Sequence, residues 1–326
     1  MIDDANANVV PTVADIEHAA GLLDPVFAHT PVLKNTSIDT VIGARMLLKV
    51  ETLNPIRSFK GRGADTWMRE VGVGADGVVC ASVGNFGQGV AYAARKHGID
   101  CRVYVGESAN PDKVTAMHRL GAQVLVGGHD YETAIETARS FADVSGWRFV
   151  QDGRNRWIAA GAGTIARELT IAGHRPDVAV MPVGNSALIL GIAAWLRHHR
   201  PGTRIVGVCA EDAPAPALSW HQQQVVTTKE VATVADGIGV REPFPESVAA
   251  MTDLVDHMVL VSEQALRHAV RLLTDTTGVL VEAAGAAGLA ALLSNPGPYH
   301  DSHIFTPLCG ANLPPDALQW APTWRD

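Results

Sequence analysis

The chain has 326 residues, of which 47% are hydrophobic and 18% are charged, and its formal net charge is −8. This composition excludes an intrinsically disordered chain. An acidic chain without a run of Lys or Arg is not expected to bind nucleic acid or an anionic membrane.

Two further features bear on the compartment. The four cysteines form no C-x-x-C pair and lie in or beside apolar runs, which is typical of reduced residues in a cytoplasmic protein; they are Cys80, Cys101, Cys209 and Cys309. The N-terminal segment is acidic and has no Lys or Arg before Lys34, which is the reverse of a signal peptide.

The longest apolar stretch, 278–293, is interrupted by Glu282 and is not expected to span a membrane.

The first half of the chain alternates short apolar strands with helices. Strands are expected at 78–81, 101–105 and 124–126, and helices at 86–97, 111–120 and 131–144. Gly98 is expected to end the first of these helices, and Asn110 with Pro111 to begin the second. This β-α-β-α-β-α order with short connections predicts a parallel sheet covered by helices.

The second half shows the same alternation. Strands are expected at 178–181, 204–209 and 303–308, and helices at 187–199, 263–274 and 285–293. The stretches 211–224 and 241–247 are rich in Pro and polar residues and are interpreted as surface loops. The chain is therefore predicted to be an α/β protein with two open, mainly parallel sheets. Residues 74–150 would form a small mobile lobe, and residues 1–73 and 151–326 a large lobe, with the active site between them at the carboxyl ends of strands.

Four segments could carry chemistry. In 54–64, Lys60 follows Phe59 and precedes Gly61, and burial would make its amine nucleophilic, although most lysines are simply exposed. The segments 81–89 and 182–188 each join a strand to a helix, where free N–H groups bind anions, although plain turns would also fit. After the last strand, Cys309 either faces a ligand or packs as a small apolar residue. There is no H-E-x-x-H, G-x-S-x-G or nucleotide-binding glycine motif.

Taken together, the order and spacing of these segments resemble the fold-type II pyridoxal-phosphate enzymes, which share the architecture of the tryptophan synthase beta subunit. The similarity is closest to threonine/serine dehydratases and serine racemase. The resemblance extends over nearly the whole chain, and Ser58-Phe59-Lys60-Gly61 is its most specific part. The matching segments are 29–32, 48–51, 58–64, 160–166, 235–238, 282–286 and 309–312.

The resemblance implies a role for each candidate residue. Lys60 would hold pyridoxal phosphate as a Schiff base and then act as the base at the substrate Cα. Phe59 would pack on the pyridine ring, Asn85 would bond the cofactor 3-hydroxyl, and Cys309 would face the pyridine nitrogen. The loop that would hold the phosphate comprises Gly184, Asn185, Ser186, Ala187 and Leu188. The loop that would bind the substrate carboxylate comprises Ser82, Val83, Gly84, Asn85 and Phe86.

The implied reaction is dehydration and deamination of an L-β-hydroxy amino acid, threonine or serine, to a 2-keto acid and ammonia. A neutral thiol at Cys309 suits elimination better than transamination, because it stabilises a protonated ring nitrogen less than a carboxylate does. The alternatives are an amino-acid racemase, a β-replacement synthase, or a catalytically silent subunit that binds pyridoxal phosphate or an amino acid. Intact Lys60 argues against the silent subunit. A cytoplasmic homodimer is expected.

The sequence departs from the family pattern at several positions. The phosphate loop contains one glycine where relatives have four, and Phe86 stands in place of the usual His. Val83 stands where racemases have Ser, and it cannot donate a proton to the second face of the substrate. No metal site is expected, because Cys209 and Ala215 occupy the positions of the metal-binding carboxylates in racemase-like relatives, unless Glu211 and Asp212 replace them. The last motif ends 14 residues before the end of the sequence, so no effector domain and no feedback inhibition by isoleucine are expected.

Overall fold

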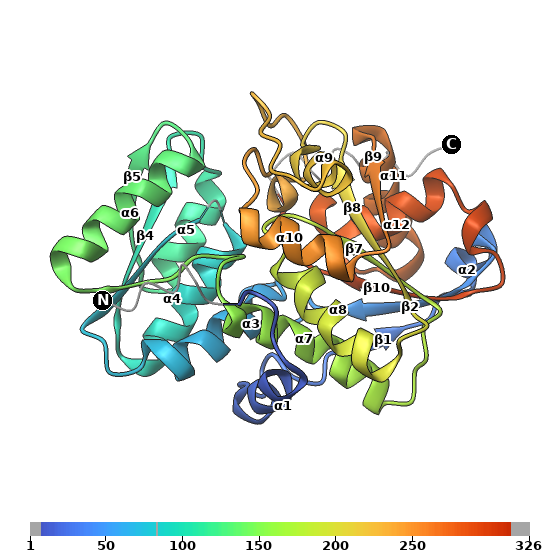
Figure 1. The fold of residues 1–326 in the computed structure, drawn as a ribbon, viewed down its shortest axis with the longest axis horizontal. Coiled ribbons are helices and arrows are strands. Elements are labelled where there is room, and N and C mark those ends of the chain that lie inside the picture. The colour runs from blue at the N-terminus through green and yellow to red at the C-terminus, as the bar shows by residue number, and fades with distance from the viewer. Residues whose placement is uncertain (1–7, 83, 314–326) are drawn as a thin grey trace.

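The computed structural model describes residues 8–82 and 84–313. Two sheets lie side by side in Figure 1, a four-stranded sheet on the left and a six-stranded sheet on the right. Their helices pack on both faces, so the α/β architecture with mainly parallel strands is confirmed. The Val83 position lies outside the described residues.

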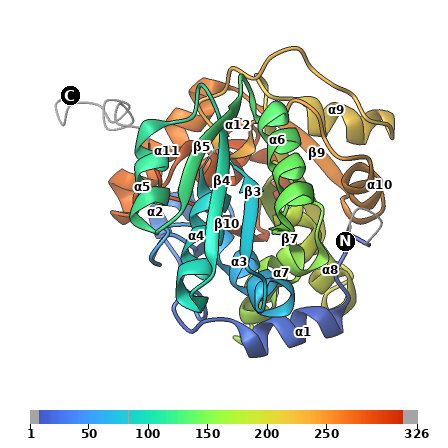
Figure 2. The same ribbon diagram turned by 90° about the vertical axis from the view of Figure 1, so that its left-hand side faces the viewer.

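The four-stranded sheet has the order β5-β4-β3-β6, and all its pairs are parallel. In Figure 2 its strands face the viewer, with α6 on one side and α4 and α5 on the other. Successive side chains of β3 point to opposite faces of the sheet. Val78 packs with α4 and Val79 packs with α6. The elements are β3 (Gly77–Ala81), α4 (Asn85–His97), β4 (Asp100–Gly106), α5 (Pro111–Arg119), β5 (Gln123–Gly128), α6 (Tyr131–Ser145) and β6 (Arg148–Phe149).

The six-stranded sheet has the order β1-β2-β10-β7-β8-β9, and only the edge strand β1 is antiparallel. Its strands are β1 (Val32–Leu33), β2 (Arg45–Val50), β7 (Val178–Pro182), β8 (Arg204–Ala210), β9 (His257–Val261) and β10 (His303–Leu308). The remaining helices are α1 (Val13–Leu22), α2 (Thr36–Ile42), α3 (Lys60–Trp67), α7 (Arg156–Ile171), α8 (Ala187–His199), α9 (Ala215–Gln222), α10 (Pro245–Leu254), α11 (Glu263–Thr277) and α12 (Ala283–Ser294). The described residues also form a π-helical turn (Met68–Gly72) and short 3-10 helices at Asp236–Ile238 and Gly297–Tyr299.

The local signals in the sequence form the expected caps. Gly98 adopts a left-handed φ of 67° at the end of α4, and the Asn110 side chain accepts a hydrogen bond from the Asp112 N–H at the start of α5. The predictions for 211–224 and 241–247 are partly wrong, because α9 lies within the first and α10 begins at Pro245 in the second. Pro214 and Pro216 lie at the start of α9 and Pro245 at the start of α10, where no N–H donor is needed.

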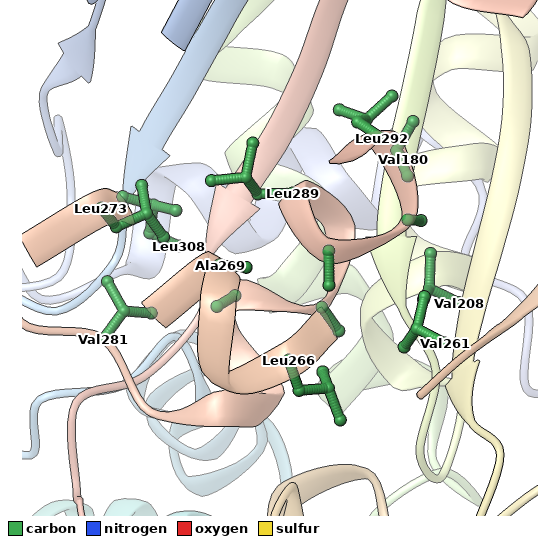
Figure 3. Packing of buried hydrophobic residues seen from close by; sticks show 14 of the residues in the cluster. Val180, Val208, Val261, Leu266, Ala269, Leu273, Val281, Leu289, Leu292 and Leu308 are labelled. Atoms are coloured by element: carbon green, nitrogen blue, oxygen red, sulfur yellow. The ribbon is translucent and has the colours of Figure 1, made fainter. Parts of the chain in front are cut away.

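The apolar run that contains Glu282 forms α12, whose residues 283–292 are all buried. It packs across the centre of the larger sheet, and Figure 3 shows Leu292 of this helix beside Val180 of β7. An all-round apolar helix of this kind belongs in the interior of a large lobe. Within the described ranges, no helix is long and apolar enough to cross a membrane.

The two halves of the molecule meet along α3. Trp67 and Met68 are buried in the same apolar cluster as Val78 and Val90 of the smaller sheet and its helix α4. In Figure 1, α3 lies between the two sheets. Helix α3 packs against α4 of the smaller half and α7 of the larger half, and the lobe boundary at 73/74 stays a prediction.

Close packing of α7 on α8 depends on glycine. A Cβ at Gly191 would overlap the carbonyl oxygen of Ala159. We expect Gly191→Ala to lower the free energy of unfolding by about 2 kcal/mol, because overpacking separates the helices. Urea denaturation measures this. In the control Gly21→Ala, the new Cβ meets no atom within 4 Å, and a gain of about 0.5–1 kcal/mol is expected from helix propensity. Equal effects in the two variants would contradict the packing argument.

Candidate active site

Lys60 stands at the first residue of α3, and its side chain is 13% exposed. Its position is fixed by the preceding turn, in which the amide of Asn54 donates to the carbonyl oxygens of Glu51 and Ser58 at 2.8 and 3.1 Å. The Phe59 N–H also donates to the Cys309 carbonyl oxygen at 2.9 Å, which ties the start of α3 to the end of β10. The amine thus projects from a rigid helix start into a pocket, as the sequence predicts for a buried lysine.

That pocket collects the segments that the sequence singled out. All predicted site residues other than Val83, which is not described, line it together. They are Phe59, Lys60, Ser82, Gly84, Asn85, Phe86, Gly184, Asn185, Ser186, Ala187, Leu188 and Cys309. Lys60 Nζ lies 4.9 Å from the ring centroid of Phe59 and 6.0 Å from that of Phe86. The individual roles assigned to these residues stay predictions.

The loop before α8 offers backbone donors to an anion. Ser186 caps the helix with a left-handed φ of 70° and makes no side-chain capping bond, so the first N–H groups of α8 are left for another acceptor. Its hydroxyl instead contacts Met251 Sδ at 3.2 Å. The loop is therefore suited to bind an anion through its backbone, which does not require the usual glycines.

The loop before α4 is braced by its own serine. Ser82 Oγ accepts hydrogen bonds from the N–H groups of Gly84 and Gly87 at 3.1 and 2.8 Å. Gly84 is also closely covered, because a Cβ there would overlap the stem of Lys113. These contacts hold the start of α4 and place Asn85 in the pocket.

A buried polar cluster surrounds Asn85. Its amide nitrogen donates to Glu282 Oε1 at 2.5 Å, and its oxygen accepts a bond from the Asn312 amide at 2.8 Å. Glu282 Oε2 accepts the Asn312 N–H at 3.1 Å. Burial raises the pKa of Glu282, although the ammonium of Lys113, 3.9 Å away, opposes this shift. The cluster fixes the orientation of the Asn85 side chain.

Lys113 links the smaller sheet to the larger one. It projects from α5 and is almost fully buried, and its ammonium donates to both carboxylate oxygens of Asp236 at 2.8 and 2.7 Å. Burial alone would lower the pKa of Lys113, but Glu282 and Asp236 outweigh this effect and raise it. Lys113 therefore stays charged and holds α5 against the larger half.

Sequence reasoning missed four polar residues of the pocket lining, namely Tyr131, Asp152, Asp236 and Glu282. Asp236 and Glu282 lie in segments that carry the family resemblance, so the resemblance could have pointed to them. Asp152 follows β6, and the rule that sites form at the carboxyl ends of parallel strands could have found it. Its Oδ2 lies 2.5 Å from Lys60 Nζ.

Cys309 lies directly after β10 and is buried. Burial raises the pKa of its thiol well above the ordinary value, and the carboxylates of Glu51 and Glu282 act in the same direction. The thiol is therefore neutral at physiological pH. Its sulfur lies 3.4 Å from the Pro307 carbonyl oxygen.

The positions that were considered for a metal lie apart from the pocket lining. Cys209 belongs to β8 and Ala215 begins α9, while Glu211 and Asp212 lie exposed between them. In the part of the chain that the structure describes, no three His, Cys, Asp or Glu side chains are grouped to hold a metal ion.

Comparison with known proteins identifies this architecture. The family described as pyridoxal-phosphate dependent enzyme matches residues 23–310. The L-threonine ammonia-lyase of Geobacter sulfurreducens is 35% identical over 285 residues, which cover 86% of this chain and 70% of that protein. Maize serine racemase superposes with a TM-score of 0.90 at 26% identity, covering 95% of this chain and 96% of that chain. The T.th. threonine deaminase superposes with a TM-score of 0.86 at 30% identity, covering 93% of this chain and 98% of that chain. The chain therefore belongs to the pyridoxal-phosphate-dependent enzyme family, and pyridoxal phosphate is its cofactor.

Proposed function

We propose that this enzyme dehydrates and deaminates an L-β-hydroxy amino acid, threonine or serine, to a 2-keto acid and ammonia. The observation that carries the proposal is the convergence of Lys60, the N-terminal turn of α8 and the neutral thiol of Cys309 on one pocket. The names of the Geobacter sulfurreducens ammonia-lyase and the T.th. threonine deaminase support the substrate class.

The residues present fit the cofactor. A buried primary amine can bind an aldehyde covalently, and the uncapped first turn of α8 offers N–H donors to a phosphate. Phe59, beside Lys60, supplies an apolar ring surface. When bound, pyridoxal phosphate withdraws electrons from the substrate Cα. Cys309 lines the same pocket, and its neutral thiol would stabilise a protonated ring nitrogen less than a carboxylate does.

In the proposed reaction the chain itself moves protons and excludes water. As a free amine, Lys60 would take the proton from the substrate Cα. The loop from Ser82 to Phe86 binds the substrate carboxylate, and Asn85 is held in place for the cofactor 3-hydroxyl by Glu282 and Asn312. Phe86 makes the mouth of the pocket apolar.

The test of the proposed function is a substrate panel. The pyridoxal-phosphate-loaded protein is incubated with L-threonine, L-serine and their D isomers, and keto acid and ammonia are measured separately. We expect both products in equal amounts from an L substrate. Formation of a thioether from an added thiol, or of cysteine from added sulfide, without keto acid, would instead favour a β-replacement synthase.

We also propose that residues 74–150 act as a mobile lobe that closes over the substrate. The salt bridge from Lys113 of α5 to Asp236 would hold the closed arrangement, because it joins the two halves at the pocket. Structures with and without a substrate analogue test the movement.

The protein is further proposed to be a cytoplasmic homodimer without a metal requirement. The four buried free cysteines support a reducing compartment. Sedimentation, cell fractionation and EDTA treatment test these three properties.

The stereochemical course provides a separate prediction. Racemisation requires a proton donor on each face of the substrate, and the side chain of Val83 has no exchangeable proton. We expect keto acid to form from the L substrate with little D isomer, and Val83→Ser to add measurable racemase activity. Chiral chromatography of the amino acid that remains after partial conversion measures both. Faster interconversion of L and D isomers than keto-acid formation by the unmodified protein would contradict the dehydratase assignment.

A further inference from the structure

Asp152 is held rigidly in the active-site pocket. Its side chain is 7% exposed and Oδ2 lies 2.5 Å from Lys60 Nζ. The next residue, Gly153, has a φ of 82°, and a Cβ there would overlap the Asn185 carbonyl oxygen. Ser247 Oγ donates to the Gly153 carbonyl oxygen at 2.9 Å. The backbone that carries Asp152 is thus packed tightly against the loop before α8.

The second carboxylate oxygen of this residue is unsatisfied. Asp152 Oδ1 is buried and has no hydrogen-bond partner among the residues that the structure describes. A buried carboxylate with a free oxygen costs free energy unless a donor reaches it. The nearby hydroxyl of Tyr131 stays protonated, because burial and the Asp152 charge both raise its pKa. The carboxylate therefore has the capacity to accept a further hydrogen bond from a ligand.

The charges of the described pocket lining are unbalanced. They comprise one cation, Lys60, and three carboxylates, Asp152, Asp236 and Glu282. Lys113 neutralises Asp236 and lies 3.9 Å from Glu282. The ammonium of Lys60 is therefore the one cationic partner of Asp152 in this lining.

Binding of the cofactor takes hydrogen-bond donors away from this partner. The ammonium form of Lys60 has three N–H donors, and covalent attachment of the cofactor leaves Nζ with at most one. The phosphate of the cofactor and the carboxylate of the substrate are both anions and cannot replace it. The buried carboxylate then has fewer donors than it can accept, and an unsatisfied buried acceptor costs free energy.

The nitrogen of an incoming amino acid must reach the cofactor carbon that Lys60 Nζ holds. Since Nζ lies 2.5 Å from Asp152 Oδ2, the carboxylate stands beside the path of that nitrogen. We propose that Asp152 binds the ammonium group of the incoming amino-acid substrate. This inference rests on the proposed function, because the ligand is taken to be an amino acid. It implies that Asp152 distinguishes an amino acid from a carboxylic acid of the same shape that lacks the amino group.

The experiment compares two ligands of similar size on the cofactor-loaded protein. L-Alanine carries the ammonium group but no β-leaving group, and L-lactate carries a hydroxyl in place of the ammonium. In Asp152→Asn, calorimetry should show L-alanine bound about 30-fold more weakly, the loss expected when a buried charge pair is broken. L-Lactate should bind equally well or better. Asp152→Glu should restore part of the preference for L-alanine.

The matched control is Glu246→Gln. Glu246 lies in α10 and pairs with Arg154, which is two residues after Asp152, but Glu246 does not line the pocket. It should keep the preference of the unmodified protein. An equal loss of L-alanine and L-lactate binding in Asp152→Asn, or no loss of either, would overturn the proposal. Failure of the unmodified protein to prefer L-alanine would also overturn it.

A second measurement covers the case in which Asp152→Asn does not retain the cofactor. In cofactor-free Lys60→Ala protein, ethylammonium should bind where the Lys60 ammonium lay and raise the melting temperature, while Lys60→Ala with Asp152→Asn should not respond. Absence of that difference would contradict the proposal. A protein that passes these binding tests but forms no keto acid from threonine or serine contradicts the proposed function alone.

Discussion

Lys60→Ala is expected to abolish covalent cofactor binding and to lower keto-acid formation by a factor of about 10³ or more, the scale on which enzymes depend on a covalent nucleophile. The reason is that this residue supplies both the covalent link and the base at Cα in the proposed reaction. Its amine is buried in the pocket beside Asp152. No other lysine lines the pocket among the described residues, so no second amine there can replace Lys60 as the nucleophile.

The measurement is borohydride reduction of the cofactor-loaded protein, followed by peptide mapping. The label should lie on Lys60, and both the label and the visible absorbance of the bound cofactor should be lost in Lys60→Ala. The control is Lys96→Ala, which removes a lysine of α4 that pairs with Asp24 away from the pocket. It should keep the label, the absorbance and the activity. A label on another lysine in the unmodified protein would refute the assignment.

Arg62→Met is expected to destabilise the protein by about 3–5 kcal/mol, because it leaves buried carboxylates without their partner. Arg62 is fully buried two residues after Lys60, and its guanidinium reaches Glu51 at 2.7 Å and Glu168 at 2.7 Å. Lys49 contacts Glu168 at 2.6 Å in the same network. Burial alone would lower the pKa of Arg62, but Glu51 and Glu168 outweigh this and raise it.

The same network predicts how stability depends on pH. Burial alone would raise the pKa of Glu168, but Arg62 and Lys49 outweigh it and bring the pKa down to about 2 from an ordinary 4.5. Since the pKa is lower in the folded protein, this carboxylate stabilises the fold fully above pH 4.5 and loses its contribution as the pH falls towards 2. The contribution is about 3 kcal/mol.

Denaturation with urea at pH 7 and at pH 3 measures both effects. Arg62→Met should be far less stable at pH 7 and should lose less than the unmodified protein on acidification. Arg62→Lys, which keeps the charge but not the forked donors, should lie between the two. The control is Arg271→Met, which removes an exposed arginine paired with the exposed Asp275 and should cost under about 1 kcal/mol. Equal losses at positions 62 and 271 would contradict the buried network.

Much of the fold was determined by local patterns in the sequence. Strands and helices such as 187–199 and 303–308 have the predicted bounds, because their apolar runs, caps and glycines act over a few residues. The candidate site residues were also predictable, because most of them follow a parallel strand, and the carboxyl ends of such strands meet at one edge. The helices α9 and α10 were missed because prolines were interpreted as loop signals rather than as helix starts.

Contacts between distant segments were decided only by the tertiary structure. Asn85 meets Glu282 across 197 residues of sequence, and Lys60 meets Asp152 across 92. No local pattern encodes which carboxylate a lysine will face, because that depends on how the two sheets pack. The left-handed backbone conformation of Ser186 was likewise unpredictable. Serine rarely adopts a positive φ, so its residue type gives no signal for this conformation. The sequence thus determined the cofactor family and the lysine expected to bind the cofactor, whereas packing decided which charges surround that lysine.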